Sequence, residues 1–328
     1  MKKIFPEKLK EGDLVRSTVP SRSREIISKE NREIADWRFE EMGLRISFGK
    51  HVEEIDEFGS SRITSRIEDL HDAFADPNVK AVFSVIGGFN SNQLLRYIDW
   101  DIMRSHPKIF CGYSDITALN NAISAKTGLV SYSGPAYSTF SEEKNFEYTL
   151  ESFRKCLFSD APFEVNPSEM WSDDPWYRDQ ANRNFIRNDG YLVINEGSAR
   201  GTLIGGNLCT LNLLQGTEYM PSLEGSVLFI EDDETSKIFD FDRNLQSLLH
   251  LSNFGGVKGI VIGRFQKASE AKNELITKMI KTKRELDHIP VIANADFGHT
   301  QSMITFPIGG EVIIEVKDTV TKIEIMKH

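Results

Sequence analysis

The sequence predicts an α/β protein whose amino-terminal part is a parallel sheet covered by helices. Short and almost continuously apolar segments, such as residues 81–86 and 109–111, are typical of buried strands. An amphipathic segment at residues 60–75 carries Ile63, Ile67 and Leu70 on one face and is typical of a helix. Short strands that alternate with helices indicate βαβ units and a parallel sheet. At 328 residues, the chain is long enough for two domains.

In the first half of the chain, strands and helices are expected to alternate regularly. The apolar and alternating patterns predict strands at residues 13–19, 44–48, 81–86, 109–111 and 129–133. Helical patterns fall at residues 24–42 and 60–75. A third helix is expected after Gly87-Gly88, in a segment that carries Leu94, Leu95 and Ile98. A fourth is expected from about Ile116 to a left-handed cap at Gly128.

The composition of the sequence changes at about residues 158–189, which are polar, aromatic and rich in turn-forming residues. Ordinary connections are much shorter, so we expect an interdomain connection with a functional loop here. After it, residues 191–195 and 199–204 are predicted to form paired strands, and further strands are expected at 226–230, 257–262, 290–294, 311–316 and 321–326. Helices are expected from Leu208 to Leu214 and at residues 238–254 and 271–286.

We therefore divide the chain into a first domain at residues 1–160, a linker and substrate loop at 161–189, and a second domain at 190–328. Polar residues follow several of the predicted strands. In parallel sheets, ligands gather at the carboxyl ends of the strands, so Gly88 and Ser114, which end successive strands, are expected to lie side by side.

Composition excludes several classes of function. The net charge is −10 without a basic stripe, so a nucleic-acid partner is not expected. No signal peptide and no apolar stretch of about 20 residues is found, so we expect no membrane partner. Three scattered cysteines predict reduced thiols in a cytoplasmic protein. Dinucleotide and P-loop fingerprints and zinc-ligand spacings are absent, so no cofactor or metal is expected.

Gly112-Tyr-Ser-Asp115 forms a tight turn between an apolar strand and a helical pattern. A serine on such a turn is exposed beside the positive end of a helix dipole, where a nucleophile would be placed. The alternative is that Ser114 or Asp115 caps the helix, because both residue types are favoured caps.

Two further residues could complete a serine-dependent site. Nucleophilic serine catalysis needs an imidazole base and a carboxylate that orients it, and Glu231 and His299 both stand at strand ends. Glu231 could instead be a solvated strand end, and His299 a hydrogen-bonded loop residue. The backbone amides of Asp115 and Gly88 are candidates for an oxyanion hole. Gly88 could equally belong to a plain tight turn.

Five motifs, in order along nearly the whole chain, resemble the LD-carboxypeptidase family of serine peptidases. They are Gly87-Gly88 after a strand, Gly112-Tyr-Ser-Asp115, Phe229-Ile-Glu-Asp-Asp233, Phe241-Asp-Arg-Asn-Leu-Gln246 and Asp296-Phe-Gly-His-Thr300. The resemblance implies Ser114 as nucleophile, His299 as general base and Glu231 as its orienting acid. It also implies a Rossmann-like first domain, a β-rich, barrel-like second domain, an active site between them, and a homodimer.

Within the family, the chain is similar to the microcin C immunity peptidase branch, which is MccF-like. The features are Gly87-Gly-Phe-Asn-Ser-Asn92, Trp171-Ser-Asp-Asp-Pro-Trp176, Ile204-Gly-Gly-Asn-Leu208 and Thr217-Glu-Tyr-Met-Pro221. This branch implies a small peptide-nucleotide or aminoacyl-sulfamoyl adenylate as substrate and a role in antibiotic resistance. The alternative substrate is a murein tetrapeptide from cell-wall recycling, and a third possibility is a non-catalytic binding module.

Three residues are candidates for substrate binding. An indole could stack on the base of a nucleotide, and Trp176 is the preferred stacking residue, with Trp171 second. Either tryptophan could instead pack the linker onto the second domain, which is the favoured interpretation for Trp171. Asn207, at a helix start, could contact the substrate or could only cap the helix.

Overall fold

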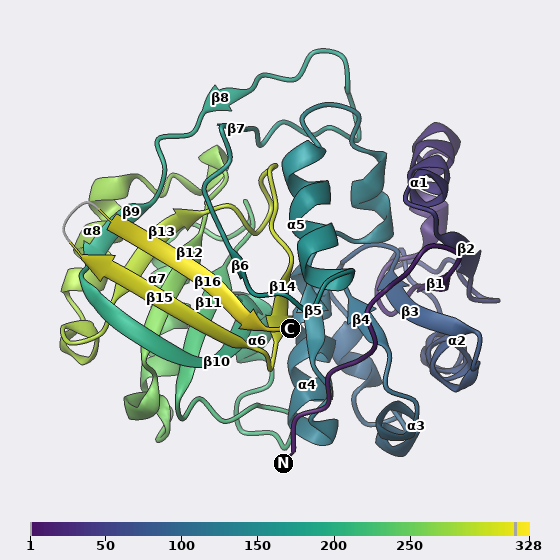
Figure 1. Ribbon diagram of the computed structural model, residues 1–328, viewed down its shortest axis with the longest axis horizontal. Coiled ribbons are helices and arrows are strands. Elements are labelled where there is room, and N and C mark those ends of the chain that lie inside the picture. Colours follow the sequence, from purple (N-terminus) through teal and green to yellow (C-terminus); the bar gives the residue numbers. More distant parts are fainter. Residues whose placement is uncertain (1, 318–319) are drawn as a thin grey trace.

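The computed structural model describes residues 2–317 and 320–328 and contains two large sheets that lie side by side (Figure 1). The first has the strand order β14-β5-β4-β3-β1-β2. Its strands from the first half of the chain pair in parallel, as predicted: β1 (Leu14–Thr18), β2 (Arg45–Phe48), β3 (Val79–Ser84), β4 (Ile109–Cys111) and β5 (Ser131–Ser133).

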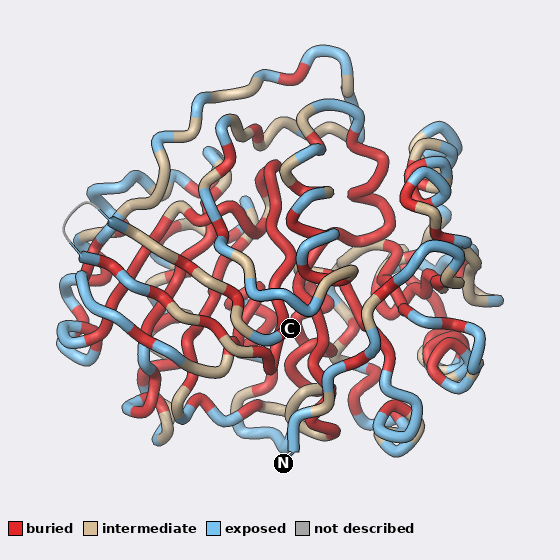
Figure 2. Tube along the Cα trace, in the orientation of Figure 1, coloured by how far each residue is buried: buried red, intermediate tan, exposed pale blue. Residues whose placement is uncertain are grey.

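Helices cover both faces of this sheet, because its strands are apolar on both sides. Val82 of β3 packs into one hydrophobic cluster and its neighbours Ala81 and Phe83 into another. The first cluster includes residues of α2 (Ile63–Ala75), α3 (Trp100–Ser105) and α4 (Thr117–Thr127), and the second includes residues of α1 (Lys29–Glu41) and α5 (Glu147–Leu157). Figure 2 shows the resulting band of buried residues through the sheet.

The second sheet is longer and mixed, with the strand order β6-β16-β15-β10-β11-β12-β13-β9. Its centre is parallel and consists of β10 (Gly197–Asn207), β11 (Ser226–Glu231), β12 (Gly259–Gly263) and β13 (Val291–Ala295). Antiparallel strands flank the centre: β6 (Phe163–Glu164), β9 (Leu192–Asn195), β15 (Glu311–Lys317) and β16 (Val320–Lys327).

This sheet curls, so that β15 and β16 cross over the central strands in Figure 1. Phe229 of β11 and Val261 of β12 share one buried cluster with Ile314 and Ile325 of the two crossing strands. The helices α6 (Leu208–Asn212), α7 (Ile238–Leu249) and α8 (Asn273–Lys281) contribute to the cluster that also contains α2 to α4. One hydrophobic core therefore runs from the first sheet to the second.

Several predicted elements were wrong in their pairing or extent. Residues 191–195 and 199–204 do not pair with each other, because β9 pairs with β13 at the sheet edge whereas β10 pairs with β11 and β15. The helix expected after Gly88 is only a single turn, Ser91–Leu94, followed by α3, which Asp99 caps. Helix α1 begins at Lys29, because the Ser28 hydroxyl accepts a hydrogen bond from the amide of Asn31.

Two long helices also end earlier than predicted. Helix α7 ends at Leu249 rather than 254, and α8 spans Asn273–Lys281 rather than 271–286, because a separate short turn follows each helix. Strand β14 (Phe306–Ile308) was not predicted at all. It pairs antiparallel with β5, so a segment of the predicted second domain completes the first sheet. The domain boundaries at 160 and 189 stay predictions.

The segment between the domains crosses the top of the molecule in Figure 1. It contains a two-stranded ribbon of β7 (Met170–Trp171) and β8 (Ile186–Arg187). The part that follows β7, residues 172–185, is called the tryptophan segment below because it carries Trp176. It lies next to the residues that precede α5 and to the loop after β13, which places it beside both domains.

Candidate active site

The turn after β4 places Ser114 in a strained conformation. Gly112 approaches β3 so closely that a Cβ atom there would lie 2.2 Å from the Oγ atom of Ser84, so only glycine fits. Ser114 itself has φ of +61°, in the left-handed region that non-glycine residues seldom occupy. Such strain is concentrated at functional sites, where the surrounding structure holds it. Helix α4 then ends at Gly128 with φ of +76°, as predicted.

Ser114, His299 and Glu231 form a chain of hydrogen bonds. The Oγ atom of Ser114 lies 2.9 Å from Nε2 of His299, and Nδ1 of His299 lies 2.9 Å from Oε2 of Glu231. The residues come from the turn after β4, the loop after β13 and the end of β11, so both sheets contribute. The fold therefore brings together three residues that are separated by 68 and 185 positions in the chain.

Glycines make room for the buried carboxylate of Glu231. A Cβ atom on Gly298 would lie 2.8 Å from Oε2 of Glu231, and one on Gly263 would lie 2.7 Å from the Cβ atom of Glu231. The loop that carries His299 is also fixed, because the buried carboxylate of Asp296 accepts a hydrogen bond from the amide of Ser168 at 2.7 Å.

The surroundings of His299 favour its charged form. Burial lowers the pKa of His299, but the charge and hydrogen bond of Glu231, together with the charges of Asp233 and Asp232, outweigh it and raise the pKa to about 9. Burial and the charge of Glu231 also raise the pKa of Asp232 to about 7. The imidazole is therefore protonated in most molecules at neutral pH, and a base role needs loss of that proton.

The carboxylate of Asp115 has a structural role that the sequence did not indicate. Its Oδ2 atom accepts hydrogen bonds from the Ser21 hydroxyl at 2.6 Å, the backbone amide of Asn90 at 3.0 Å and the backbone amide of Ser91 at 2.9 Å. The carboxylate thus ties the turn after β1 and the turn after β3 to the residue next to Ser114.

The Gly87-Gly88 segment lies against the serine. A Cβ atom on Gly87 would lie 2.9 Å from Cβ of Ser114 and 3.6 Å from the amide nitrogen of Asp115, so a side chain there would displace the serine. Within residues 2–317 and 320–328, the amide of Gly88 donates no hydrogen bond. Gly88, the next residue in the chain, lines the same cavity as Ser114.

A cavity of about 420 Å³ opens at Ser114 and His299. Its lining includes Gly87 and Gly88 from the first domain, Asp233 and Glu234 from the second, and Trp176 from the tryptophan segment. This cavity, called the serine cavity below, is large enough for a small ligand. Phe89, with 78% of its surface exposed, adds an aromatic side chain to the same lining, which sequence reasoning missed.

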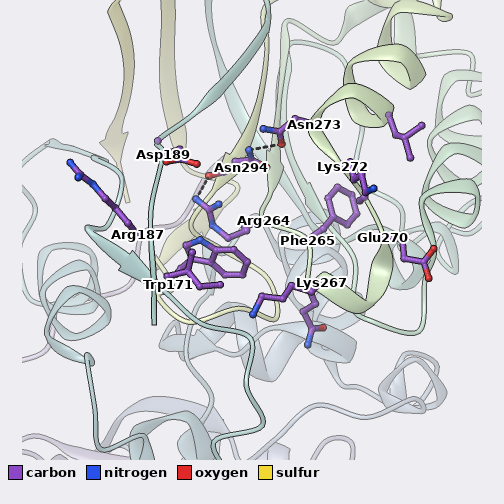
Figure 3. Close-up of a pocket in the computed structure, with 15 residues that line it drawn as sticks. Trp171, Arg187, Asp189, Arg264, Phe265, Lys267, Glu270, Lys272, Asn273 and Asn294 are labelled. Carbon is purple, nitrogen blue, oxygen red and sulfur yellow. Dashed lines mark hydrogen bonds between the residues drawn. The ribbon is translucent and has the colours of Figure 1, made fainter. Parts of the chain in front are cut away.

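Trp171 lies in a different cavity, of about 700 Å³, which Figure 3 shows. The guanidinium of Arg264 lies 5.0 Å from the centre of the indole and the ammonium of Lys267 lies 5.5 Å from it, so cations already contact this ring. Trp171 is not among the residues that line the serine cavity. Of its two interpretations, packing of the linker onto the second domain fits these contacts.

The tryptophan segment is attached to both domains. At its start, Asp173 pairs with Lys267 of the second domain at 3.0 Å. Towards its end, Arg183 forms a buried ion pair with Glu142 of the first domain at 3.1 Å. Between them, the side-chain amide of Gln180 donates to the carbonyl of Ser141 at 2.7 Å. These contacts hold Trp176 at the serine cavity.

Asn207 is buried and is not among the residues that line the serine cavity. Its side-chain oxygen accepts a hydrogen bond from the amide of Thr210 at 3.0 Å, which caps α6, and its side-chain amide donates to Asp232 at 3.2 Å. Of the two interpretations that the sequence left open, the helix cap fits this geometry.

In the part of the chain that the structure describes, no three histidine, cysteine, aspartate or glutamate side chains gather as a metal site would require. No helix among these residues has the length and apolarity to span a bilayer.

Comparison with known proteins shows which family the chain matches. Residues 15–134 match the model of the LD-carboxypeptidase N-terminal domain, and residues 200–314 match that of the LD-carboxypeptidase C-terminal domain. The protein YocD of Bacillus subtilis (strain 168), which is named as a carboxypeptidase, is 55% identical over 99% of this chain and 100% of its own length.

Solved structures and a further relative are similar to this chain over most of its length. The crystal structure of an MccF-like protein from Bacillus anthracis str. Ames matches with a TM-score of 0.98 and 56% identity, over 99% of this chain and 100% of that chain. The microcin C7 self-immunity protein MccF of Escherichia coli is 34% identical over 83% of this chain and 82% of its own. A structure of MccF with aspartyl sulfamoyl adenosine matches with a TM-score of 0.89 and 29% identity, over 99% of each chain.

Proposed function

Because this chain belongs to the LD-carboxypeptidase family of serine peptidases, whose members include carboxypeptidase-type hydrolases, we propose that it hydrolyses the amide or acyl linkage of microcin C-like peptide-nucleotides or aminoacyl-sulfamoyl adenylates. Hydrolysis would inactivate such compounds and so confer resistance to them. The proposed setting is the cytoplasm, and the proposed assembly is a homodimer.

The observation that carries the substrate proposal is the position of Trp176. It lines the same cavity as Ser114 and His299, whereas Trp171 lines another. A nucleobase that stacks on Trp176 would gain about 1–3 kcal/mol and would leave the rest of the ligand near the serine. The complex of MccF with aspartyl sulfamoyl adenosine supports this class of ligand by similarity.

In the proposed mechanism, His299 takes the proton of Ser114 as the hydroxyl attacks the scissile carbonyl carbon. The 2.9 Å distances between Ser114 and His299 and between His299 and Glu231 support these roles. Glu231 would orient the ring and stabilise the imidazolium that forms. The amides of Gly88 and Asp115 would donate hydrogen bonds to the developing oxyanion.

The attack gives a tetrahedral intermediate. Its collapse would break the bond to the leaving nitrogen, which takes the proton from His299, and leave the acyl group on Ser114. Water, activated through the same imidazole, would then release the acyl group and regenerate the serine. No step requires a metal ion or cofactor.

A second candidate substrate is a murein tetrapeptide. The family models that match both halves of the chain carry the name LD-carboxypeptidase, which favours a peptide with a D-amino acid at its carboxyl end. The chemistry of Ser114 and His299 would be the same, and only the leaving group would differ.

Hydrolysis of aspartyl sulfamoyl adenosine and of a murein tetrapeptide, measured side by side under the same conditions, tests the proposal. We expect a higher kcat/KM for the adenylate analogue, and loss of both turnover and cellular protection in the Ser114→Ala variant. Turnover of the tetrapeptide alone would contradict the preferred substrate. Protection by Ser114→Ala cells equal to that of wild type would instead support a non-catalytic binding module.

A further inference from the structure

Arg22 lies at the serine cavity beside the Gly87-Gly88 segment. A Cβ atom on Gly87 would lie 2.9 Å from Cβ of Ser114, and one on Gly88 would lie 2.6 Å from Cγ of Arg22. Because the two glycines are consecutive, a single dipeptide separates the stem of the arginine from the serine. Arg22 also lines the cavity itself.

The position of Arg22 is fixed by its neighbours in the chain. The hydroxyl of Ser21 donates to the carboxylate of Asp115 at 2.6 Å, and the amide of Ser23 donates to the carbonyl of Gly59 at 2.9 Å. The Nε atom of Arg22 lies 3.6 Å from where a Cβ atom of Gly59 would be. The side chain therefore extends over two glycines, Gly88 and Gly59, and a group held in this way loses less freedom when it binds a ligand.

The guanidinium group of Arg22 has no hydrogen bond or ion pair with any of the described residues. Besides His299, which the mechanism uses as the base, the other charged groups in the lining are four carboxylates and Arg178, which lies 5.6 Å from the ring centre of Tyr177. The carboxylates are Asp173, Asp174, Asp233 and Glu234. Because His299 must be neutral to act as the base, an anionic ligand group beside the scissile amide needs another cation, and Arg22 and Arg178 are the two arginines in the lining.

We propose that Arg22 binds an anionic group of the substrate next to the scissile amide and thereby selects acidic substrates. This inference rests on the proposed function. A guanidinium binds a carboxylate, sulfamate or phosphoramidate through two parallel hydrogen bonds, which gives both affinity and orientation. The anion could belong to the acyl side chain, as in an aspartyl residue, or to the leaving group, as in a sulfamate or a terminal carboxylate.

Three related substrates distinguish these two sources of the anion. Aspartyl sulfamoyl adenosine carries both charges, and its asparaginyl counterpart lacks the charge on the acyl side chain. The aspartyl amide of 5′-amino-5′-deoxyadenosine lacks the charge on the leaving group. Murein tetrapeptide and its D-alaninamide form a second pair that differs only in the terminal carboxylate. Steady-state kcat/KM is measured for wild type and for the Arg22→Met, Arg22→Lys and Arg96→Met variants. Arg96 is an exposed arginine outside the serine cavity and controls for the lost charge.

We expect Arg22→Met to lower kcat/KM on the fully charged substrate by about 10–100-fold. On the analogue that lacks the anion bound by Arg22, the variant should match wild type within about twofold, which identifies the source of the anion. Arg22→Lys should retain part of the preference, because it keeps the charge but not the planar fork, and Arg96→Met should behave as wild type.

An equal loss on every substrate, or no loss on the charged one, would overturn the inference while leaving the proposed function intact. The first of these results is also what a folding defect in Arg22→Met would produce, so Arg22→Lys and the melting temperature of each variant separate the two causes. A wild-type protein that hydrolyses no member of either substrate set would contradict the proposed function, and this inference with it.

Discussion

The turn that carries Ser114 and the tryptophan segment line the same cavity but are held in place in different ways. The turn is held within one domain, by close approach of Gly112 and Gly87 to neighbouring serines and by three hydrogen bonds to the carboxylate of Asp115. The tryptophan segment is held by side-chain contacts to different domains, through ion pairs with Lys267 and Glu142 and a hydrogen bond from Gln180 to the carbonyl of Ser141.

This difference has a functional meaning. A nucleophile needs a position defined to within a fraction of an ångström, and the turn has close packing that provides it. A segment attached through side-chain contacts to two domains can adapt to the ligand while it keeps Trp176 at the cavity. We therefore expect changes in the turn to lower kcat and changes in the tryptophan segment to raise KM.

The largest effect is expected from Ser114→Ala. If Ser114 is the nucleophile, kcat should fall by at least about 10⁴-fold, because the remaining groups of such a site act as a unit with it. The melting temperature should not fall, since among the described residues the hydroxyl hydrogen-bonds only with His299. Single-turnover hydrolysis measures the loss, and a loss below about tenfold would exclude a nucleophile role.

Asp115→Ala should lower kcat by about 100-fold and destabilise the protein by about 2–4 kcal/mol. The substitution leaves the buried amide of Ser91, the amide of Asn90 and the hydroxyl of Ser21 without their acceptor, and each unsatisfied group costs about 1–3 kcal/mol. Thermal unfolding and kcat are measured together, with substrate saturating. Reduced stability with unchanged kcat would show that Asp115 supports the fold but does not position Ser114.

The rate should rise with pH well above neutrality. A general base must be neutral, and with a pKa of about 9 only about 1% of His299 is neutral at pH 7, so kcat/KM should rise about tenfold per pH unit and level off near pH 9. Because the charge of Asp233 raises this pKa, the Asp233→Asn profile should move to lower pH. A flat profile between about pH 7 and 9 would contradict a base role for His299.

The smallest effect is expected from the two tryptophans. Trp176→Ala should raise KM by about 5–100-fold through the loss of base stacking, with kcat nearly unchanged. Trp171→Ala is the matched control, because this indole lies in the second cavity against Arg264 and Lys267. The reverse result, with KM sensitive to Trp171 and not to Trp176, would place the base in the cavity of Figure 3.

Local patterns predicted the parts of the fold that depend on local forces. The alternating apolar segments predicted the parallel strands of the first sheet, and the glycine and serine of the turn after β4 predicted a sharp strand-to-helix junction. Such patterns could not predict which strands pair. Strand β14, only three residues long, joins the first sheet from a distant part of the chain, and nothing in its own sequence indicates that partner.

In the candidate site, too, the sequence predicted some residues, whereas the roles of others depend on tertiary contacts. Ser114, Glu231 and His299 were selected because they stand at strand ends and match family motifs, and His299 lies within hydrogen-bond distance of both Ser114 and Glu231. The carboxylate role of Asp115, the cap role of Asn207 and the separation of Trp171 from Trp176 depend on contacts across the fold. Those contacts are set by tertiary packing, which a single sequence does not display.

The most direct test is a crystal structure of the Ser114→Ala protein with aspartyl sulfamoyl adenosine bound. We expect the scissile carbonyl carbon to lie next to residue 114, with its oxygen toward the amides of Gly88 and Asp115 and the adenine stacked on Trp176. A ligand bound in the second cavity against Trp171, or in the serine cavity with its scissile carbonyl remote from residue 114, would contradict the proposed site.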